Sequence, residues 1–134
     1  MIPRFQRVDH IHIYVVDRAA AEAWYADVLG FARIPELEFW AGSGPLTVTD
    51  ASGTVHLALF QREAQKCRSV VALAADAAEL LAWQKHLTSA LGQPIELVDH
   101  QVSWSLYFTD PDGNPYEITT YEHAEVAAAL SSRG

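Results

Sequence analysis

The order of strand and helix signals is the same in both halves of the chain, and this repetition is the strongest constraint on the fold. Residues 8–16 alternate polar and aliphatic side chains with a period of two, as a strand with two unlike faces does. Asp17 follows at a helix N-cap position, and an apolar stripe with helical spacing then runs to Gly30, which can end the helix. Strand-like pieces at residues 32–39, 46–49 and 54–61 complete this half.

The second half repeats the same order of elements. A strand at residues 69–74 precedes Asp76 and Glu79, which have the spacing of a capping box, and a helical stripe that Gly92 closes. Further strands are expected at residues 95–100, 103–109 and 116–121. The sequence therefore predicts an α+β fold with two βαβββ modules, residues 6–62 and 67–122, in a single domain 1–134. Residues 123–134 are predicted to form a short helical tail that frays.

Composition excludes several classes of partner and site. A net charge of −8 argues against binding to nucleic acid or to an anionic membrane surface. The single cysteine, Cys67, cannot form an intrachain disulfide, and no pattern around it indicates a catalytic thiol. No apolar run approaches the roughly 20 residues of a membrane span, and no signal peptide pattern is present. We expect a cytoplasmic protein that acts on or binds a small molecule.

The polar faces of the predicted strands carry side chains that are typical of an active site. Glu117 stands alone as an acid in its strand, a position that is costly unless the carboxylate meets water, a cation or a metal. If the aliphatic faces pack on the helices, the opposite faces bring titratable and hydroxyl groups together, as a binding site requires. The residues on those faces are His10, His12, Tyr14, His56, Tyr107, Glu117 and Tyr121.

Two segments resemble the vicinal oxygen chelate superfamily, which includes glyoxalase I, fosfomycin-resistance thiol transferases, extradiol dioxygenases and bleomycin-resistance proteins. The first is VDHIHIYVVDRAAAEAWYADVLGF, in which His10 stands seven residues before Asp17, and the second is YFTDPDGNPYEI. Both lie in the expected order within the duplicated βαβββ pattern, so the resemblance covers nearly the whole chain. It implies a glyoxalase/bleomycin-resistance/dioxygenase-like pair of half-barrel modules around a small-molecule site, and a homodimer.

The resemblance also implies a divalent metal, which would be Fe, Mn, Ni or Zn. Its ligands would be His10 in the first strand and Glu117 in the last. Superfamily members that use metal also have a ligand, usually His, at the start of the fifth strand, where this chain has Ser69. The site is therefore incomplete there. His56, in the fourth strand, could supply the missing ligand, since imidazole suits these metals; alternatively, the metal site is lost.

A further likeness is to the extradiol dioxygenases. His100, shortly before SWSLYF, and Tyr107, ten residues before Glu117, resemble the acid–base histidine and the tyrosine of those enzymes. Trp40 lies beside a glycine-rich loop, where its ring could cap a flat aromatic ligand. The substrate pocket is predicted to consist of His12, Tyr14, Trp40, Phe60, Ser69 and Tyr121.

Two functions from different classes remain open at this point. One is a lyase or dioxygenase, glyoxalase-like or extradiol-dioxygenase-like, that uses a divalent metal to chelate vicinal oxygens of its substrate. The other is a metal-free drug- or metabolite-binding protein of the bleomycin-resistance type. The presence of both His10 and Glu117 favours the enzyme, and the missing ligand at Ser69 favours the binding protein. We favour the enzyme.

Overall fold

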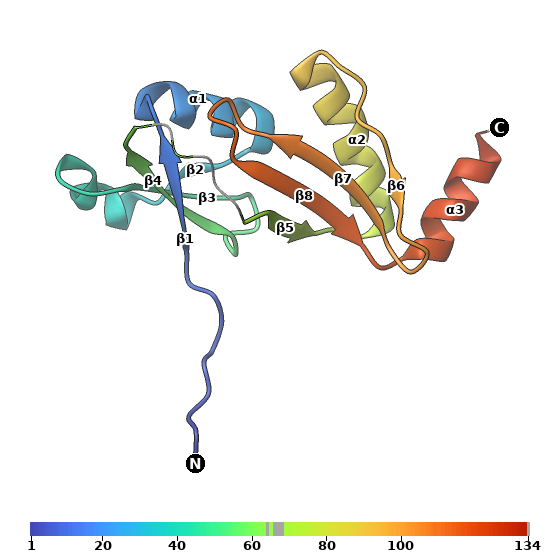
Figure 1. Cartoon of the computed structure of the whole chain (residues 1–134), viewed down its shortest axis with the longest axis horizontal. Helices are drawn as coiled ribbons and strands as arrows, with labels where there is room; N and C mark the ends of the chain where they lie inside the picture. Colours follow the sequence, from blue (N-terminus) through green and yellow to red (C-terminus); the bar gives the residue numbers. More distant parts are fainter. Residues whose placement is uncertain (64, 66–68, 134) are drawn as a thin grey trace. The chain divides into compact units, whose positions relative to one another are not determined.

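The computed structural model describes residues 1–63, 65 and 69–133, and the chain divides into two compact units, Met1–Gln65 and Lys66–Gly134. Cys67 and the prediction about its thiol lie outside the described residues. In each unit a strand and a helix precede three further strands (Figure 1). The prediction of an α+β fold with two βαβββ modules is confirmed. Among the helices described, none combines the length and apolar character needed to cross a membrane.

The N-terminal unit is a four-stranded mixed sheet with one α-helix. Its elements are β1 (Ile11–Val15), α1 (Arg18–Leu29), β2 (Ala32–Arg33), a 3₁₀ helix η1 (Pro35–Gly42), β3 (Leu46–Thr49) and β4 (His56–Gln61). The strand order is β1-β4-β3-β2, with β1 parallel to β4 and the other pairs antiparallel. Helix α1 begins where the Asp17 carboxylate accepts a 3.1 Å hydrogen bond from the amide of Ala20. It ends at Gly30, whose φ of 75° suits glycine.

The strand predicted over residues 32–39 is wrong beyond Arg33, because η1 replaces it. Pro35 cannot donate a backbone hydrogen bond to a neighbouring strand, and its fixed φ suits the first turn of a helix. The guanidinium of Arg18 then donates to the carbonyl oxygens of Ala41 and Gly44, at 2.7 and 2.8 Å, and ties the end of η1 to α1.

The C-terminal unit repeats this topology and adds a helix. Its elements are β5 (Val71–Ala74), α2 (Ala77–Leu91), β6 (Val98–Asp99), β7 (Trp104–Thr109), β8 (Pro115–Thr120) and α3 (His123–Ser132). The strand order is β5-β8-β7-β6, with β5 parallel to β8. The predicted capping box is present, since Asp76 accepts from the amide of Glu79 and Glu79 accepts from the amide of Asp76. The predicted helical tail is a ten-residue helix, α3, and its Val126 is fully buried.

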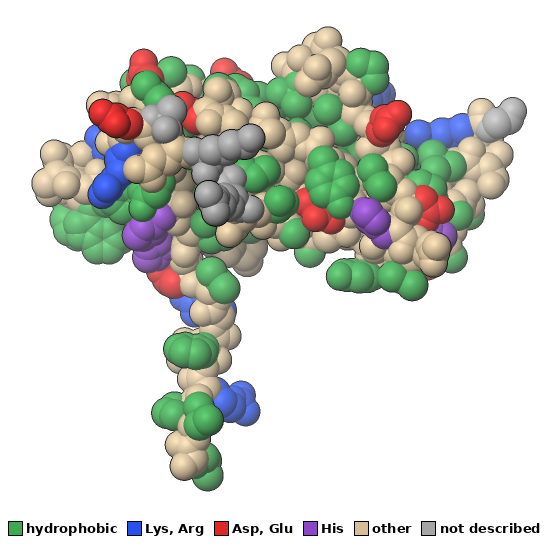
Figure 2. Space-filling model, in the orientation of Figure 1, with side chains coloured by type: hydrophobic (Ala, Val, Ile, Leu, Met, Phe, Trp, Pro, Cys, Tyr) green, Lys and Arg blue, Asp and Glu red, His purple; other side chains and the backbone are tan. Residues whose placement is uncertain are grey.

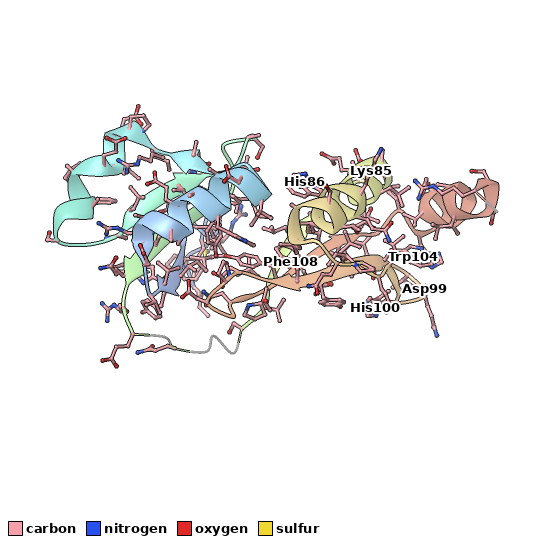
Figure 3. All side chains as sticks on the ribbon, turned by 90° about the horizontal axis from the view of Figure 1, so that it is seen from above. Lys85, His86, Asp99, His100, Trp104 and Phe108 are labelled. Atoms are coloured by element: carbon pink, nitrogen blue, oxygen red, sulfur yellow. The ribbon has the colours of Figure 1, made fainter. Side chains whose placement is uncertain are left out.

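Alternation along the strands separates a buried face from a polar face in each unit. In β1, Ile13 and Val15 are buried whereas His12 is exposed. In β8, Tyr116 and Ile118 are buried whereas Glu117 is only half-buried. Figure 3 shows Lys85 and His86 on the α2 side of the C-terminal sheet and His100 on the other side. The functional candidates therefore lie on the sheet faces that the helices leave open.

The turn between β7 and β8 sets the register of the strand that carries Glu117. Asp110 is 3% exposed, and its carboxylate accepts three hydrogen bonds of 2.8–2.9 Å, from the amides of Asp112 and Asn114 and from the side chain of Asn114. Gly113 completes the turn with a φ of 84°. In the resulting register Tyr107 pairs with Glu117.

Replacing Asp110 tests how much this turn contributes to stability. In Asp110→Ala three donors lose their acceptor inside a nearly buried turn, so we expect the free energy of unfolding to fall by about 3 kcal/mol. Urea denaturation followed by circular dichroism measures this change. Glu96→Ala removes an exposed carboxylate from the same unit and should change stability by less than about 0.5 kcal/mol. Equal effects of the two substitutions would contradict the role of the Asp110 carboxylate.

Helix α3 is attached to the strands through its first residue, His123. The carboxylate of Asp99 lies 2.7 Å from Nε2 of His123 and accepts a hydrogen bond from the amide of Gln101. The indole of Trp104 stacks on the His123 ring, with centroids 5.3 Å apart, and donates to the carbonyl oxygen of His123. These contacts also hold the end of β6, which immediately precedes His100.

The carboxylate of Asp99 makes stability depend on pH. Hydrogen bonds from the amide of Gln101 and from His123 lower the pKa of Asp99. A group whose pKa is lower in the folded chain stabilises the fold above its unfolded pKa, and this contribution is lost as the pH falls through the folded pKa. We therefore expect stability to decline on acidification below about pH 4 and to decline less in Asp99→Asn. Urea denaturation at a series of acidic pH values measures both slopes, and identical slopes would contradict this contribution.

Candidate metal-binding and acid–base residues

The histidines of the N-terminal unit gather where β1 and β4 begin. His56 is the first residue of β4, His12 lies in β1, and His10 immediately precedes β1. The two strands run parallel, with Ile11 paired with Leu57, so their N-terminal ends are adjacent. Figure 2 shows a patch of histidine side chains at the base of the N-terminal segment that leads into β1.

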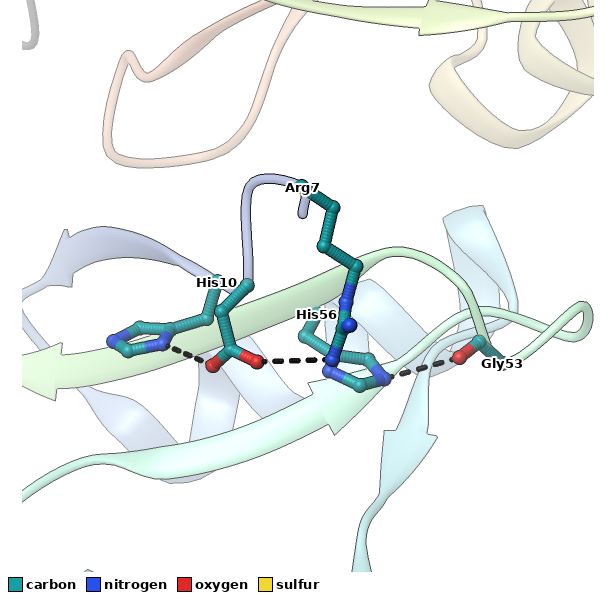
Figure 4. A network of polar contacts seen from close by, with 5 residues as sticks. Arg7, His10, Gly53 and His56 are labelled. Carbon is teal, nitrogen blue, oxygen red and sulfur yellow. Dashed lines mark hydrogen bonds and ion pairs between the residues drawn. The ribbon is translucent and has the colours of Figure 1, made fainter. Parts of the chain in front are cut away.

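His10 is held by a carboxylate on one side of its ring and faces a second imidazole on the other. Its Nδ1 lies 2.8 Å from Oδ2 of Asp9, and its Nε2 lies 3.0 Å from Nε2 of His12. Arg7 in turn contacts Asp9 at 3.4 Å (Figure 4). An ionised carboxylate only accepts, so Nδ1 of His10 is the donor, and in the neutral form of the ring Nε2 carries the lone pair. A carboxylate partner on the far nitrogen is the usual environment of a metal-binding histidine.

The contact between His10 and Asp9 also changes the pKa of Asp9. The hydrogen bond from His10 is the main cause that lowers the pKa of Asp9, with smaller electrostatic contributions from His10, Arg7 and His56. Asp9 is therefore a carboxylate at neutral pH and can keep the Nδ1 proton of His10 in place.

His56, the predicted replacement ligand, points its Nε2 toward the turn before β4. That nitrogen lies 3.0 Å from the carbonyl oxygen of Gly53 (Figure 4). Because a carbonyl only accepts, Nε2 of His56 carries a proton in this orientation. Binding a metal through Nε2 would require this hydrogen bond to break.

Three of the predicted pocket residues lie together on the polar face of β1 and β4. Tyr14 pairs with Phe60, and the ring of Phe60 contacts those of His12 and Tyr14, with centroids 4.7 and 5.9 Å apart. Sequence reasoning missed Arg62, whose guanidinium lies over the rings of Tyr14 and Phe60 at 5.2 and 5.5 Å. The period-two pattern could have found it, since Arg62 is two residues beyond Phe60. Trp40, in η1, contacts Phe39 instead and is 46% exposed.

The C-terminal unit brings His100, Tyr107 and Glu117 to one sheet face. Nε2 of His100 lies 2.9 Å from the hydroxyl of Tyr107, and Tyr107 pairs with Glu117 across β7 and β8. The carboxylate of Glu117 accepts a 2.7 Å hydrogen bond from Ser105, which is fully buried. Ser105 was not among the predicted site residues, although its spacing of two from Tyr107 places both side chains on the same face of β7.

A tight turn brings His100 to Tyr107. Gln101 has a positive φ of 73°, which is uncommon for a residue with a side chain, and its amide is held by Asp99. The amide of His100 donates to the carbonyl of Ser103 at 2.9 Å, so the chain reverses between β6 and β7. Two residues seven positions apart are thus brought into hydrogen-bonding contact.

The remaining predicted residues lie at the ends of strands in the C-terminal unit. Ser69 is exposed and precedes the first residue of β5 by two positions. In the register of β5 and β8, Ala72 is the residue that pairs with Glu117. Tyr121 directly follows β8 and is 79% exposed.

The imidazole and carboxylate donors among the described residues are of kinds that suit a divalent transition metal. Among the described residues, no group of three or more His, Cys, Asp or Glu side chains is positioned to hold one ion. The N-terminal unit offers the adjacent imidazoles of His10 and His12, and the C-terminal unit offers the carboxylate of Glu117. Imidazole and carboxylate are ligand types that suit Fe, Ni, Zn and Mn.

Solved structures of other proteins share this fold. A glyoxalase family protein from Bacillus anthracis is 22% identical, with a TM-score of 0.68 over 90% of this chain and 99% of that one. Lactoylglutathione lyase from Agrobacterium tumefaciens is 23% identical, with a TM-score of 0.68 over 90% and 97%. A mutant of the fosfomycin resistance protein FosX from Listeria monocytogenes, complexed with Mn(II) and 1S,2S-dihydroxypropylphosphonic acid, is 16% identical, with a TM-score of 0.67 over 87% and 93%.

The solved structures are too distant in sequence to show the family of this chain, but a family model does show it. Residues 7–118 match the model of the Glyoxalase/Bleomycin resistance protein/Dioxygenase superfamily, whereas no curated protein matches the chain significantly. The matched segment runs from before β1 into β8 and ends one residue after Glu117. The chain therefore belongs to the Glyoxalase/Bleomycin resistance protein/Dioxygenase superfamily.

Proposed function

We propose that this protein is a small-molecule enzyme in which His10 and Glu117 hold a divalent metal that chelates two adjacent oxygen atoms of the substrate. The observation that carries the proposal is the hydrogen bond between His100 and Tyr107 on the sheet face where Tyr107 pairs with Glu117. A proton acceptor and a hydroxyl beside a carboxylate are the parts that proton transfer at a bound substrate needs. When bound, the metal would supply Lewis acidity that stabilises negative charge on a substrate oxygen.

Side chains of the protein would transfer the proton and position the metal ligands. Nε2 of His100 would accept a proton from the substrate in place of its hydrogen bond with Tyr107, whose hydroxyl would then donate a hydrogen bond to a substrate oxygen. Ser105, fully buried, would hold the carboxylate of Glu117 in one orientation. In the N-terminal unit, Asp9 would keep the proton of His10 on Nδ1 and so leave Nε2 available as a ligand.

The relatives support a small-molecule substrate and a metal. The FosX structure contains Mn(II), and the Agrobacterium protein is a lactoylglutathione lyase. By the same superfamily resemblance, we propose that the protein acts in the cytoplasm as a homodimer. Ring cleavage of a catechol and isomerisation of a hemithioacetal are the two reaction types that we would test first.

The second candidate is a metal-free protein that binds a drug or metabolite. It is favoured by one observation, that β5 consists of Val71, Ala72, Leu73 and Ala74 and so offers no ligating side chain beside Glu117. Metal analysis separates the two candidates, because only the enzyme requires an ion.

Metal content is the first test of the proposal. Protein purified without chelators and titrated with Fe(II), Mn(II), Ni(II) or Zn(II) should bind about one ion per chain, measured by elemental analysis. His10→Ala and Glu117→Gln should each weaken binding by at least about 10-fold, because each removes a ligand. His86→Ala, at an exposed position on α2, should bind like the unaltered protein. Undiminished affinity in the His10 and Glu117 variants would refute the ligand assignment, and no binding by the unaltered protein would favour the second candidate.

The acid–base pair is tested separately. His100→Gln and Tyr107→Phe should lower kcat by about 100-fold, the usual contribution of a positioned acid or base, and leave metal content unchanged. The substrates to screen are catechols under oxygen and the hemithioacetal of methylglyoxal and glutathione. His86→Gln is the matched control and should keep full activity. If both variants turn over substrate at the normal rate, His100 and Tyr107 take no part in proton transfer.

A further inference from the structure

We infer that His12 is a metal ligand and that His10 and His12 bind the same divalent ion as a two-histidine chelate. This inference rests on the proposed function, since the ion is the one proposed there. It changes the role of His12, which the sequence analysis placed in the substrate pocket, and it leaves His56 outside the ligand set.

The backbone places both rings on one face. Residues two apart on a strand project to the same side, and β1 keeps its opposite side buried through Ile13 and Val15. In the parallel pairing of β1 and β4, His12 pairs with Ala58, two residues before Phe60. The ring of His12 contacts that of Phe60, 4.7 Å away, which supports the imidazole on one side.

The spacing of the two nitrogens suits one ion. The Nε2 atoms of His10 and His12 are 3.0 Å apart, and the rings are 19° from parallel. Two nitrogens each about 2.1 Å from a metal lie about 3.0 Å apart at an octahedral angle and about 3.4 Å apart at a tetrahedral one. The ion would lie beside the line that joins the nitrogens, so both rings would turn toward it. The side chain of His10 is 42% exposed and His12 is exposed, so the rings can turn and the ion can reach them.

The protons of the two rings are compatible with this role. Asp9 holds the Nδ1 proton of His10, so when both rings are neutral the proton between the two Nε2 atoms belongs to His12. When an ion binds, His12 would move that proton to its own Nδ1 through solvent, and both Nε2 lone pairs would become available without net proton release. His56 differs, because its Nε2 is engaged by the carbonyl oxygen of Gly53.

An imidazole pair also predicts which ions bind best. Imidazole favours Ni and Zn, whereas Mn prefers oxygen ligands, and affinity generally rises from Mn(II) to Ni(II). A chelate of His10 and His12 should therefore bind Ni(II) and Zn(II) more tightly than Mn(II). A site with His10 as its single imidazole should show a smaller preference.

The test compares full-length variants by competition with a chromogenic chelator for Ni(II) and Zn(II). His12→Ala should weaken binding by at least about 10-fold, as much as His10→Ala does, and His56→Ala should bind like the unaltered protein. Imidazole ¹⁵N spectra of the unaltered protein provide a second measurement that does not depend on folding of a variant. On addition of Zn(II), the Nε2 resonances of His10 and His12 should shift and that of His56 should stay.

The outcomes separate this inference from the proposed function. If His12→Ala binds as tightly as the unaltered protein while His10→Ala and Glu117→Gln bind weakly, the chelate is refuted and the proposed metal site stands. If the His10 and His12 variants lose binding and Glu117→Gln keeps it, the chelate stands and Glu117 is not a ligand. An unshifted His12 resonance in Zn(II) likewise refutes the chelate.

Discussion

The parallel pairing of the first and last strands of each unit is the constraint on which the candidate residues depend. In the N-terminal unit it sets β1 beside β4, and in the C-terminal unit it sets β5 beside β8. One face is buried through Ile13, Val15, Leu57 and Leu59 in the N-terminal pair, and through Tyr116 and Ile118 of β8 in the C-terminal pair. A parallel pair needs a crossover, and the connecting helix begins right after the first strand. His12 and Glu117 lie on the opposite face of their strands.

On these open faces, neighbouring side chains position the candidate groups. Asp9 holds His10, Ser105 holds Glu117, and the turn at Gln101 brings His100 to Tyr107. A positive φ at Gln101 is a strained conformation, and such strain is found most often near functional sites. A buried hydroxyl, that of Ser105, and a strained backbone, at Gln101, thus position side chains that the packing of the core does not require. This pattern supports an active site more than a surface that is merely polar.

Local signals made most of the fold predictable. The caps at Asp17 and Asp76 and the glycines that end both helices lie next to the elements they define, so their effect is visible in the sequence. Residues 36–39, Glu-Leu-Glu-Phe, alternate like a strand, yet Pro35 and the contacts of Arg18 produce a 3₁₀ helix. Side-chain partners were harder to foresee. The hydrogen bonds of His12 and His56 depend on ring orientation, which alternation along a strand does not specify.

The proposed metal site requires that imidazole and carboxylate groups of this chain bind one ion. X-ray absorption at the K-edge of Ni(II)-loaded protein would reveal these ligands, because the fine structure counts imidazole rings around the ion. We expect two imidazoles in the unaltered protein, one in His12→Ala, and the loss of one carboxylate oxygen in Glu117→Gln. A coordination shell of water oxygens without imidazole would refute the proposed site.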